Sequence, residues 1–377
     1  MIRRLIQWLW YKKIEKNKKL IDVIAFESVP VLSDNTKGIF DEMLKRGLNK
    51  KYKLVWLIWD KEKVNNFKSE HKNVEFVYVK SRKGNRYDWY AKAKISCNEV
   101  LIKKDKKQFC IYLTHGTALK SVRNYYNIPK EMDYCLLASK DVFDLQSYEL
   151  CFAKEKAIAL GFPRNDELTN SKIDVRSILG TDCKKIVVWY PTYRQRKDGF
   201  EVKGNSLPVI HDEEQAKNLN EAAKKLNVLL VLKPHFAQNL SYVKDLHLSN
   251  IRFIDDSFFV KNNVSSYQFV GSCDALITDY SSIYYDFTLC DKPIAAIWED
   301  IEKYKESPGL VENYEFWAKG MEKVYTLEDF ISFLERVAQG KDVLQKERRE
   351  IRDLANISID GKNSQRVVDF IMQKANL

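Results

Sequence analysis

The sequence has little glycine, little proline and no long apolar run. Its 13 glycines and 8 prolines among 377 residues are too few for a collagen-like or low-complexity chain. A membrane-spanning helix needs roughly 18 consecutive apolar residues, and no segment reaches that length. The N-terminal apolar stretch "LIQWLW" is also too short for a signal peptide, and no small-residue cleavage site follows it. We therefore expect a soluble globular protein.

Several cofactor and disulfide motifs are missing as well. The seven cysteines are odd in number, form no CxxC pair and mostly lie in apolar runs, which predicts reduced core cysteines. The histidines and cysteines show no spacing typical of metal ligands. No GxGxxG sequence follows a predicted strand, and no Walker sequence occurs. We expect no metal and no other cofactor.

The proportions of charged and apolar residues are those of a folded protein, and the net charge favours anionic partners. Hydrophobic residues make up 45% of the chain and charged residues 31%, and the net charge is +11. This length fits two domains of about 100–200 residues each. A basic surplus favours nucleic acids, phosphorylated substrates or acidic lipids. Lysine and arginine are spread along the chain and no RNA-binding motif occurs, so we expect no nucleic-acid partner.

The first twenty residues form a separate basic, aromatic-rich segment. Ile2, Leu5, Ile6 and Leu9 recur at helical spacing, with tryptophans nearby and seven basic residues facing the single acid Glu15. Such a helix can lie in the headgroup region of an anionic membrane surface. The alternative is a helix that packs on the domain and leaves its lysines in water.

Short apolar runs alternate with amphipathic stretches along the rest of the chain, which predicts parallel sheets with crossover helices. Gly161 and Pro163 interrupt this pattern, and a second alternating series begins near 185. We therefore expect two α/β domains, at 1–165 and 166–377. The predicted strands lie at 21–28, 53–60, 74–79, 94–100, 133–139, 274–282 and 292–298, with three more that run into loops within 108–116, 185–194 and 228–236. The predicted helices lie at 36–47, 140–150, 213–226, 282–290 and 326–340, with a mostly helical stretch at 343–375.

Four polar motifs follow predicted strands: "HGT" at 115–117, "PTYR" at 191–194, "KPH" at 233–235 and "DYSS" at 279–282. In open α/β sheets, ligands bind beyond the carboxyl ends of the strands. Two of the chain's five histidines, His115 and His235, stand at such ends, one in each half. A histidine there can act as a base or donate to a phosphate near neutral pH, although a single histidine is often structural.

The "DYSS" motif marks a point where a predicted strand turns into a helix. Ser281 or Ser282 can cap that helix, and its free N–H groups would make an anion site. Asp279 would orient a neighbouring group. Simple capping, with Asp279 bonded to turn amides, is the alternative interpretation.

Taken in order, "HGTALK", "GFPRND", "PTYR", "LKPHF", "LITDYSSIYYDF" and "KPIAAIWEDIEKY" resemble the CDP-glycerol glycerophosphotransferases, the teichoic acid primases and polymerases and their capsule relatives. The resemblance runs from about residue 110 to 320. It implies an α/β GT-B fold, in which two Rossmann-like domains face a cleft and the C-terminal domain binds CDP-glycerol or a related CDP-alcohol.

The resemblance also implies a reaction and a cellular location. An acceptor hydroxyl attacks the β-phosphorus, glycerol phosphate is transferred and CMP leaves. The implied acceptor is a saccharide or polymer on undecaprenyl diphosphate, which places the enzyme peripherally on the cytoplasmic face of the cell membrane.

The resemblance assigns roles to individual residues. His115 is the expected general base, and His235 with Ser281 and Ser282 would hold the diphosphate. Arg194 and Lys233 would neutralise phosphate charge, and Asp279 would order its loop. His115, His235 and Asp279 are thus the expected catalytic residues. The remaining residues expected to bind substrate are Gly116, Thr117, Arg164, Asn165, Thr192, Tyr280, Asp286, Glu302 and Tyr304.

The sequence departs from the family pattern after Tyr304. It reads "KESPGLVENYE" where many members have an Arg-Gly-Phe-Tyr sequence, which leaves a CDP-ribitol donor open. The chain lacks the long N-terminal region of some polymerases, which favours a single-unit primase. Two other functions remain as alternatives: a GT-B glycosyltransferase that uses a nucleotide sugar, and a basic binding protein without turnover.

Overall fold

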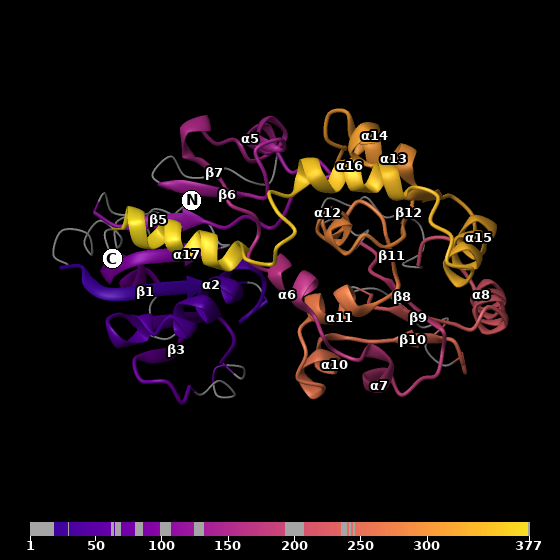
Figure 1. Cartoon of the computed structure of the whole chain (residues 1–377), viewed down its shortest axis with the longest axis horizontal. Coiled ribbons are helices and arrows are strands. Elements are labelled where there is room, and N and C mark those ends of the chain that lie inside the picture. The colour runs from indigo at the N-terminus through magenta and orange to yellow at the C-terminus, as the bar shows by residue number, and fades with distance from the viewer. Residues whose placement is uncertain are drawn as a thin grey trace, which may run out of the picture. The chain divides into compact units, whose positions relative to one another are not determined.

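The computed structural model describes most of the chain. The described residues are 19–375, without 29, 62–63, 65–68, 80–85, 99–106, 124–131, 193–206, 235–239, 241–242 and 244–245. They form two compact units (Figure 1). Unit 1 comprises residues up to 116, 123–166 and the residues from 362 on, and unit 2 comprises 117–122 and 167–361.

Unit 1 is built on a parallel sheet with the strand order β3-β2-β1-β4-β5-β6-β7. The strand order reverses between β1 and β4, as in doubly wound folds. The strands are β1 (Ile21–Glu27), β2 (Lys53–Ile58), β3 (Val74–Tyr78), β4 (Ala93–Asn98), β5 (Phe109–Tyr112), β6 (Tyr134–Leu137) and β7 (Ala157–Ala159). The helices are α2 (Asp34–Lys45), η1 (Leu48–Lys50), α4 (Arg86–Lys92), α5 (Phe143–Leu150), η2 (Lys154–Lys156) and α17 (Asn363–Lys374).

Unit 2 contains a second parallel sheet with the order β10-β9-β8-β11-β12-β13, which reverses between β8 and β11. Its strands are β8 (Lys185–Trp189), β9 (Val228–Leu232), β10 (Ile251–Phe253), β11 (Ala275–Thr278), β12 (Ile294–Ile297) and β13 (Glu322–Val324). The helices are α7 (Val175–Leu179), α8 (Glu213–Lys225), α10 (Asp256–Lys261), α11 (Ser266–Ser272), α12 (Ile283–Phe287), η3 (Thr288–Cys290), α13 (Ile301–Glu306), α14 (Tyr314–Trp317), α15 (Leu327–Ala338) and α16 (Gln345–Ala355).

The C-terminal helix α17 packs on unit 1, far from its neighbours in sequence. Val367, Val368 and Ile371 belong to the same apolar core as Ile39 and Phe40 of α2, and Figure 1 shows the two helices side by side. The predicted helical stretch at 343–375 is therefore two helices, which pack on different units.

The ends of α15 follow the sequence signals. The hydroxyl of Thr326 accepts a hydrogen bond from the Asp329 N–H, and the Asp329 carboxylate bonds back to the Thr326 N–H, which completes a capping box. Gly340 follows the helix with a φ of 69°, the left-handed conformation that glycine adopts at low cost. The predicted start and end of this helix are confirmed.

The chain passes between the units at four points, and one of them lies within α6 (Asn165–Asn170), after Asp166. This point lies next to the boundary expected at 165/166. The grouping assigns 362–377 to unit 1 and 117–122 to unit 2, and the boundary of the folding domains stays a prediction. Within the described residues, no helix is long and apolar enough to span a membrane.

Candidate functional site

The loop after β5 presents His115 at the carboxyl end of the sheet in unit 1. Its side chain is half-buried. The residue before it, Thr114, has a φ of 54°, and Gly116 after it has a φ of 112°. A left-handed backbone costs a non-glycine residue roughly 1–2 kcal/mol, and β-branched residues adopt it least readily. Such strain persists only where surrounding contacts hold it, and it concentrates at functional sites.

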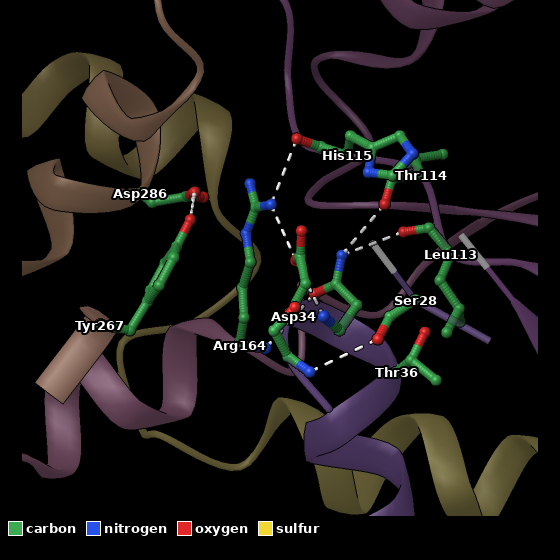
Figure 2. Close-up of polar contacts among 12 residues, drawn as sticks. Ser28, Asp34, Thr36, Leu113, Thr114, His115, Arg164, Tyr267 and Asp286 are labelled. Carbon is green, nitrogen blue, oxygen red and sulfur yellow. Dashed lines mark hydrogen bonds and ion pairs between the residues drawn. The ribbon is translucent and has the colours of Figure 1, made fainter. Parts of the chain in front are cut away.

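The other residues expected near His115 are buried in unit 1 or at its boundary. Arg164 is 5% exposed, and its guanidinium contacts the Asp34 carboxylate and the His115 carbonyl oxygen, as Figure 2 shows. Asn165 is buried beside it. The Gly116 carbonyl accepts a hydrogen bond from Gln146 Nε2 at 2.9 Å. Both side chains lie inside the fold. Substrate contacts by Arg164 and Asn165 stay a prediction.

Thr117 is the first residue of the 117–122 segment of unit 2, and it is fully buried. In the described structure its hydroxyl has no hydrogen-bond partner. The rest of the segment pairs with the chain near 310: the Val311 N–H donates to the Leu119 carbonyl, and the Ser121 N–H donates to the Gly309 carbonyl. These bonds fix the backbone that follows the His115 loop.

In unit 2, three predicted site residues follow the adjacent strands β9, β8 and β11: Lys233, Thr192 and Asp279. The Asp279 carboxylate is fully buried and accepts hydrogen bonds from the Thr192 N–H at 2.7 Å, from the Thr192 hydroxyl, and from the Tyr280 N–H at 2.6 Å. It joins the ends of β8 and β11 at the point where the strand order reverses. Lys233 Nζ lies 3.0 Å from the carboxylate of Asp256. These hydrogen bonds tie the loop after β11 to the loop after β8, and a catalytic role for Asp279 stays a prediction.

The residues after Asp279 divide into a buried aromatic group and two serines nearer the surface. Tyr280 stacks on Tyr304 with 3.6 Å between ring centroids, and its hydroxyl donates to Asp300 at 2.9 Å. Ser281 and Ser282 are only partly buried. Ser282 makes no capping bond to α12, and Ser281 Oγ accepts from the Ile283 N–H only at 3.5 Å. Asp279 accepts from the Tyr280 N–H, as the capping interpretation expects, and phosphate binding by the two serines stays a prediction.

The remaining predicted residues lie in different surroundings. Asp286 is buried, and its carboxylate accepts a hydrogen bond from the Tyr267 hydroxyl at 2.8 Å, also shown in Figure 2. Tyr304 is buried in the aromatic stack, whereas the Glu302 side chain is 80% exposed and pairs with Lys305. Arg194 and His235 lie outside the described residues, so their roles stay predictions.

Comparisons with known proteins now decide the family. The model of the CDP-Glycerol:Poly(glycerophosphate) glycerophosphotransferase family matches residues 9–373. The chain belongs to this family. The class of enzyme that the ordered motifs predicted is confirmed, as is its place in teichoic acid synthesis.

Two curated relatives illustrate the similarity. The teichoic acid poly(glycerol phosphate) polymerase of Bacillus spizizenii is 26% identical over 338 residues, which cover 81% of both proteins. The teichoic acid glycerol-phosphate primase of Bacillus subtilis is 23% identical over 252 residues. That alignment covers 66% of this chain and 60% of the primase, so the chain spans less than two thirds of its length.

Solved structures of a related polymerase have the same fold as this chain. The wall teichoic acid polymerase TagF is 23% identical, with a TM-score of 0.75 over 96% of this chain and 91% of that one. A TagF variant soaked with CDPG gives a TM-score of 0.74 at 24% identity. The expected α/β fold of the GT-B type is confirmed.

Sequence reasoning missed two residues near His115 and one buried lysine. Asp34 and Asn35 begin α2; Asn35 donates to the Leu113 carbonyl, and Asp34 pairs with Arg164. Their only signal was the "SDN" triplet before an amphipathic stretch. Lys323 in β13 lies 4.3 Å from the centre of the Trp298 ring, and its ammonium donates to the carbonyls of Ala318 and Met321. Burial lowers the pKa of Lys323 to about 7. No motif in the sequence marks this lysine.

Proposed function

We propose that the protein transfers glycerol phosphate from CDP-glycerol to a hydroxyl of a lipid-linked saccharide or polymer and releases CMP, in the synthesis of teichoic acid or a capsule-type polymer. The match of the family model to residues 9–373 carries this proposal. The named relatives support it, because they are glycerol-phosphate primases and polymerases of teichoic acid.

In the proposed reaction, His115 accepts the proton of the acceptor hydroxyl while that oxygen attacks the β-phosphorus. The bond between this phosphorus and the oxygen that bridges to CMP breaks, and CMP leaves with the electron pair. A base can act there because the loop after β5 presents His115 half-buried rather than within the core. A positioned base of this kind contributes about 10²–10⁴-fold to the rate.

We propose that the donor diphosphate binds at the carboxyl ends of β9, β8 and β11. Lys233 would supply positive charge, and the hydroxyls of Ser281 and Ser282 would donate to the phosphate oxygens, together with Arg194 and His235. Asp279 would act indirectly, because its carboxylate already accepts hydrogen bonds from Thr192 and Tyr280. Its task is then to hold the loops that carry the phosphate-binding groups.

The acceptor and the location belong to the same proposal. A saccharide on undecaprenyl diphosphate would place the reaction at the cytoplasmic face of the membrane, and the basic segment 1–20 would hold the enzyme there on anionic lipids. A net charge of +11 supports both a phosphorylated donor and an anionic surface.

A donor screen tests the proposal. The protein is incubated with a lipid-linked saccharide and with CDP-glycerol, CDP-ribitol or common UDP-sugars, and the released nucleotide is measured by chromatography. We expect CMP from CDP-glycerol, formed with a product heavier by one or more glycerol phosphates. A reaction without acceptor controls for hydrolysis. If CMP is released only from CDP-ribitol, the donor is CDP-ribitol and not CDP-glycerol. If UDP is released from a UDP-sugar and no CMP forms, the proposed reaction is rejected in favour of a glycosyltransferase.

A further inference from the structure

Two side chains of unit 1 bond to the backbone of the His115 loop, those of Asn35 and Arg164, and a third, that of Asp34, holds Arg164. Asp34 and Asn35 begin α2, and Arg164 precedes α6. They are distant in sequence from the loop, and the hydrogen bonds to it span 78, 79 and 49 residues. We call Asp34, Asn35 and Arg164 the loop clamp (Figure 2).

The side-chain amide of Asn35 makes its three described hydrogen bonds to backbone groups near His115. It is fully buried, and its Nδ2 donates to the carbonyl oxygens of Leu113 at 3.1 Å and Thr114 at 3.3 Å. Its Oδ1 accepts from the Arg164 N–H at 3.3 Å. One amide group thus ties the loop after β5 to the loop that carries Arg164, and it satisfies backbone groups that burial would otherwise leave unpaired.

Arg164 extends the same contacts to His115 itself. Its Nη1 lies 2.8 Å from Asp34 Oδ1 and 3.2 Å from the His115 carbonyl oxygen. Asp34 Oδ1 also accepts from the Asn35 N–H at 2.8 Å. Three consecutive carbonyls, those of Leu113, Thr114 and His115, therefore each accept a hydrogen bond from the loop clamp.

The clamped carbonyls flank a strained turn. Thr114 has a φ of 54°, although it is β-branched, and its hydroxyl adds a bond to the Leu136 carbonyl at 3.1 Å. A left-handed threonine needs such external bonds, because its own backbone preference lies elsewhere. The residue whose direction this turn sets is His115.

From these contacts we infer that Asp34, Asn35 and Arg164 are positioning residues, which hold the Thr114 turn so that His115 meets the acceptor hydroxyl. The inference rests on the proposed role of His115. It gives Arg164 a task within the fold instead of a contact with substrate. The hydrogen bonds described above join the clamp to the loop through backbone carbonyls, so loss of the clamp should move the imidazole without removing it.

The substitution Asn35→Asp tests the inference with almost no change in shape. An aspartate keeps the oxygen that faces the Arg164 N–H but sets a second oxygen against the carbonyls of Leu113 and Thr114. We expect kcat for CMP release from CDP-glycerol to fall by about 10²-fold, the scale of a 1 Å misplacement, with the KM for CDP-glycerol within about threefold.

Asn250→Asp is the matched control. Asn250 is also buried, and its Nδ2 donates to the Val228 carbonyl at 2.9 Å. Val228 is the first residue of β9, so this bond lies at the end of the strand opposite to Lys233. The Asn250→Asp substitution should lower the melting temperature, as Asn35→Asp does, but leave the kcat of the folded fraction unchanged. This comparison separates positioning from general loss of stability.

The double variant Asn35→Asp/His115→Ala decides how the clamp acts. If the clamp works through His115, the double variant turns over no more slowly than His115→Ala. A further drop of the full single-variant size, or an unchanged kcat in folded Asn35→Asp, overturns the inference. If Asn35→Asp does not fold, Arg164→Met is judged by the same criteria, with Arg164→Lys expected to keep more activity.

The proposed base and the proposed clamp can be rejected separately. A normal kcat in His115→Ala rejects the proposed base and the clamp together. A lowered kcat in His115→Ala with a normal kcat in the folded clamp variant rejects only the clamp. Absence of CMP release by the unaltered protein rejects the proposed reaction itself.

Discussion

Asp279 bonds to both the backbone N–H and the hydroxyl of Thr192, and so it joins the ends of β11 and β8. The two strands are neighbours at the point where the strand order of unit 2 reverses. Ligands of open α/β sheets bind at such points. The buried Asp279 carboxylate thus supports this edge, together with the hydrogen bond from the Thr278 hydroxyl to the Tyr190 carbonyl.

Asp279→Asn should weaken donor binding and lower stability together. The substitution replaces one carboxylate oxygen, which accepts hydrogen bonds, with an NH2 group that only donates. The N–H or O–H donor facing that group would lose its acceptor, and a buried group left unpaired costs about 1–3 kcal/mol. Calorimetry with CDP-glycerol and thermal unfolding measure the two effects. Asp274→Asn is the control, because Asp274 accepts from the Ile186 N–H at the opposite end of the same strand pair. It should lose stability while it keeps donor affinity; equal affinity losses in both variants would reject a local role for Asp279.

His115→Ala should lower kcat by about 10²–10⁴-fold and leave binding of CDP-glycerol nearly intact, since a lost general base affects the chemical step. Single-turnover CMP release and calorimetry separate these quantities. His71→Ala is the control, because His71 is an exposed histidine of the same unit. Normal turnover in His115→Ala would make His115 a structural residue.

Ser281→Ala and His235→Ala should each weaken CDP-glycerol binding by about tenfold, because each removes a hydrogen bond to a charged phosphate. Calorimetry gives the affinities. Ser272→Ala, in the same unit but bonded to Ser171, should bind the donor normally. Unchanged affinity in both test variants would reject the proposed phosphate site.

The sequence predicted the strands of the sheet interiors, because their apolar runs are buried on both faces. It missed β7, β10 and β13, which are three-residue strands at sheet edges. Edge strands are short and half-exposed, so they leave no apolar run to recognise. Some predicted strand ends were also too late, as at 274–282, where β11 ends at Thr278.

The motifs name candidate site residues but not the partners that hold them in the fold. Arg164 belongs to "GFPRND" and is expected to bind substrate, and in the fold its guanidinium pairs with Asp34, 130 residues away in sequence. Such a pairing depends on which strands become neighbours, and a local pattern does not record it. The same holds for Asp279, whose partner Thr192 lies 87 residues earlier.

The N-terminal segment, which lies outside the described residues, should bind anionic membranes. Each basic residue near the surface contributes roughly 1 kcal/mol, screened by salt. Deleting residues 1–20 should reduce sedimentation with anionic vesicles and activity on a long-chain acceptor, while activity on a soluble short-chain analogue is retained. Leu5→Ser/Leu9→Ser keeps the charge and isolates the apolar contribution. If the truncated protein sediments as well as the intact one, the segment is not the anchor.

Lys323 should give stability a pH dependence above neutrality. Its folded pKa of about 7 lies below the ordinary value of 10.5, since burial penalises the charged ammonium. Between these two values the unfolded chain binds more protons, so the free energy of unfolding should rise with pH, by at most about 1.4 kcal/mol per pH unit. Urea unfolding of the intact protein and of Lys323→Met, from pH 7 to 10, measures the difference.

Lys323→Met should remove this rise, because methionine fills the same space without a proton to lose. Lys217→Met is the control, since it removes an equal charge from an exposed position on α8. The carbonyls of Ala318 and Met321 stabilise the ammonium and limit the effect, so the direction of the slope is the decisive observation. If Lys323→Met and the intact protein show parallel pH dependence, Lys323 stays charged in the fold and its environment is less apolar than its burial indicates.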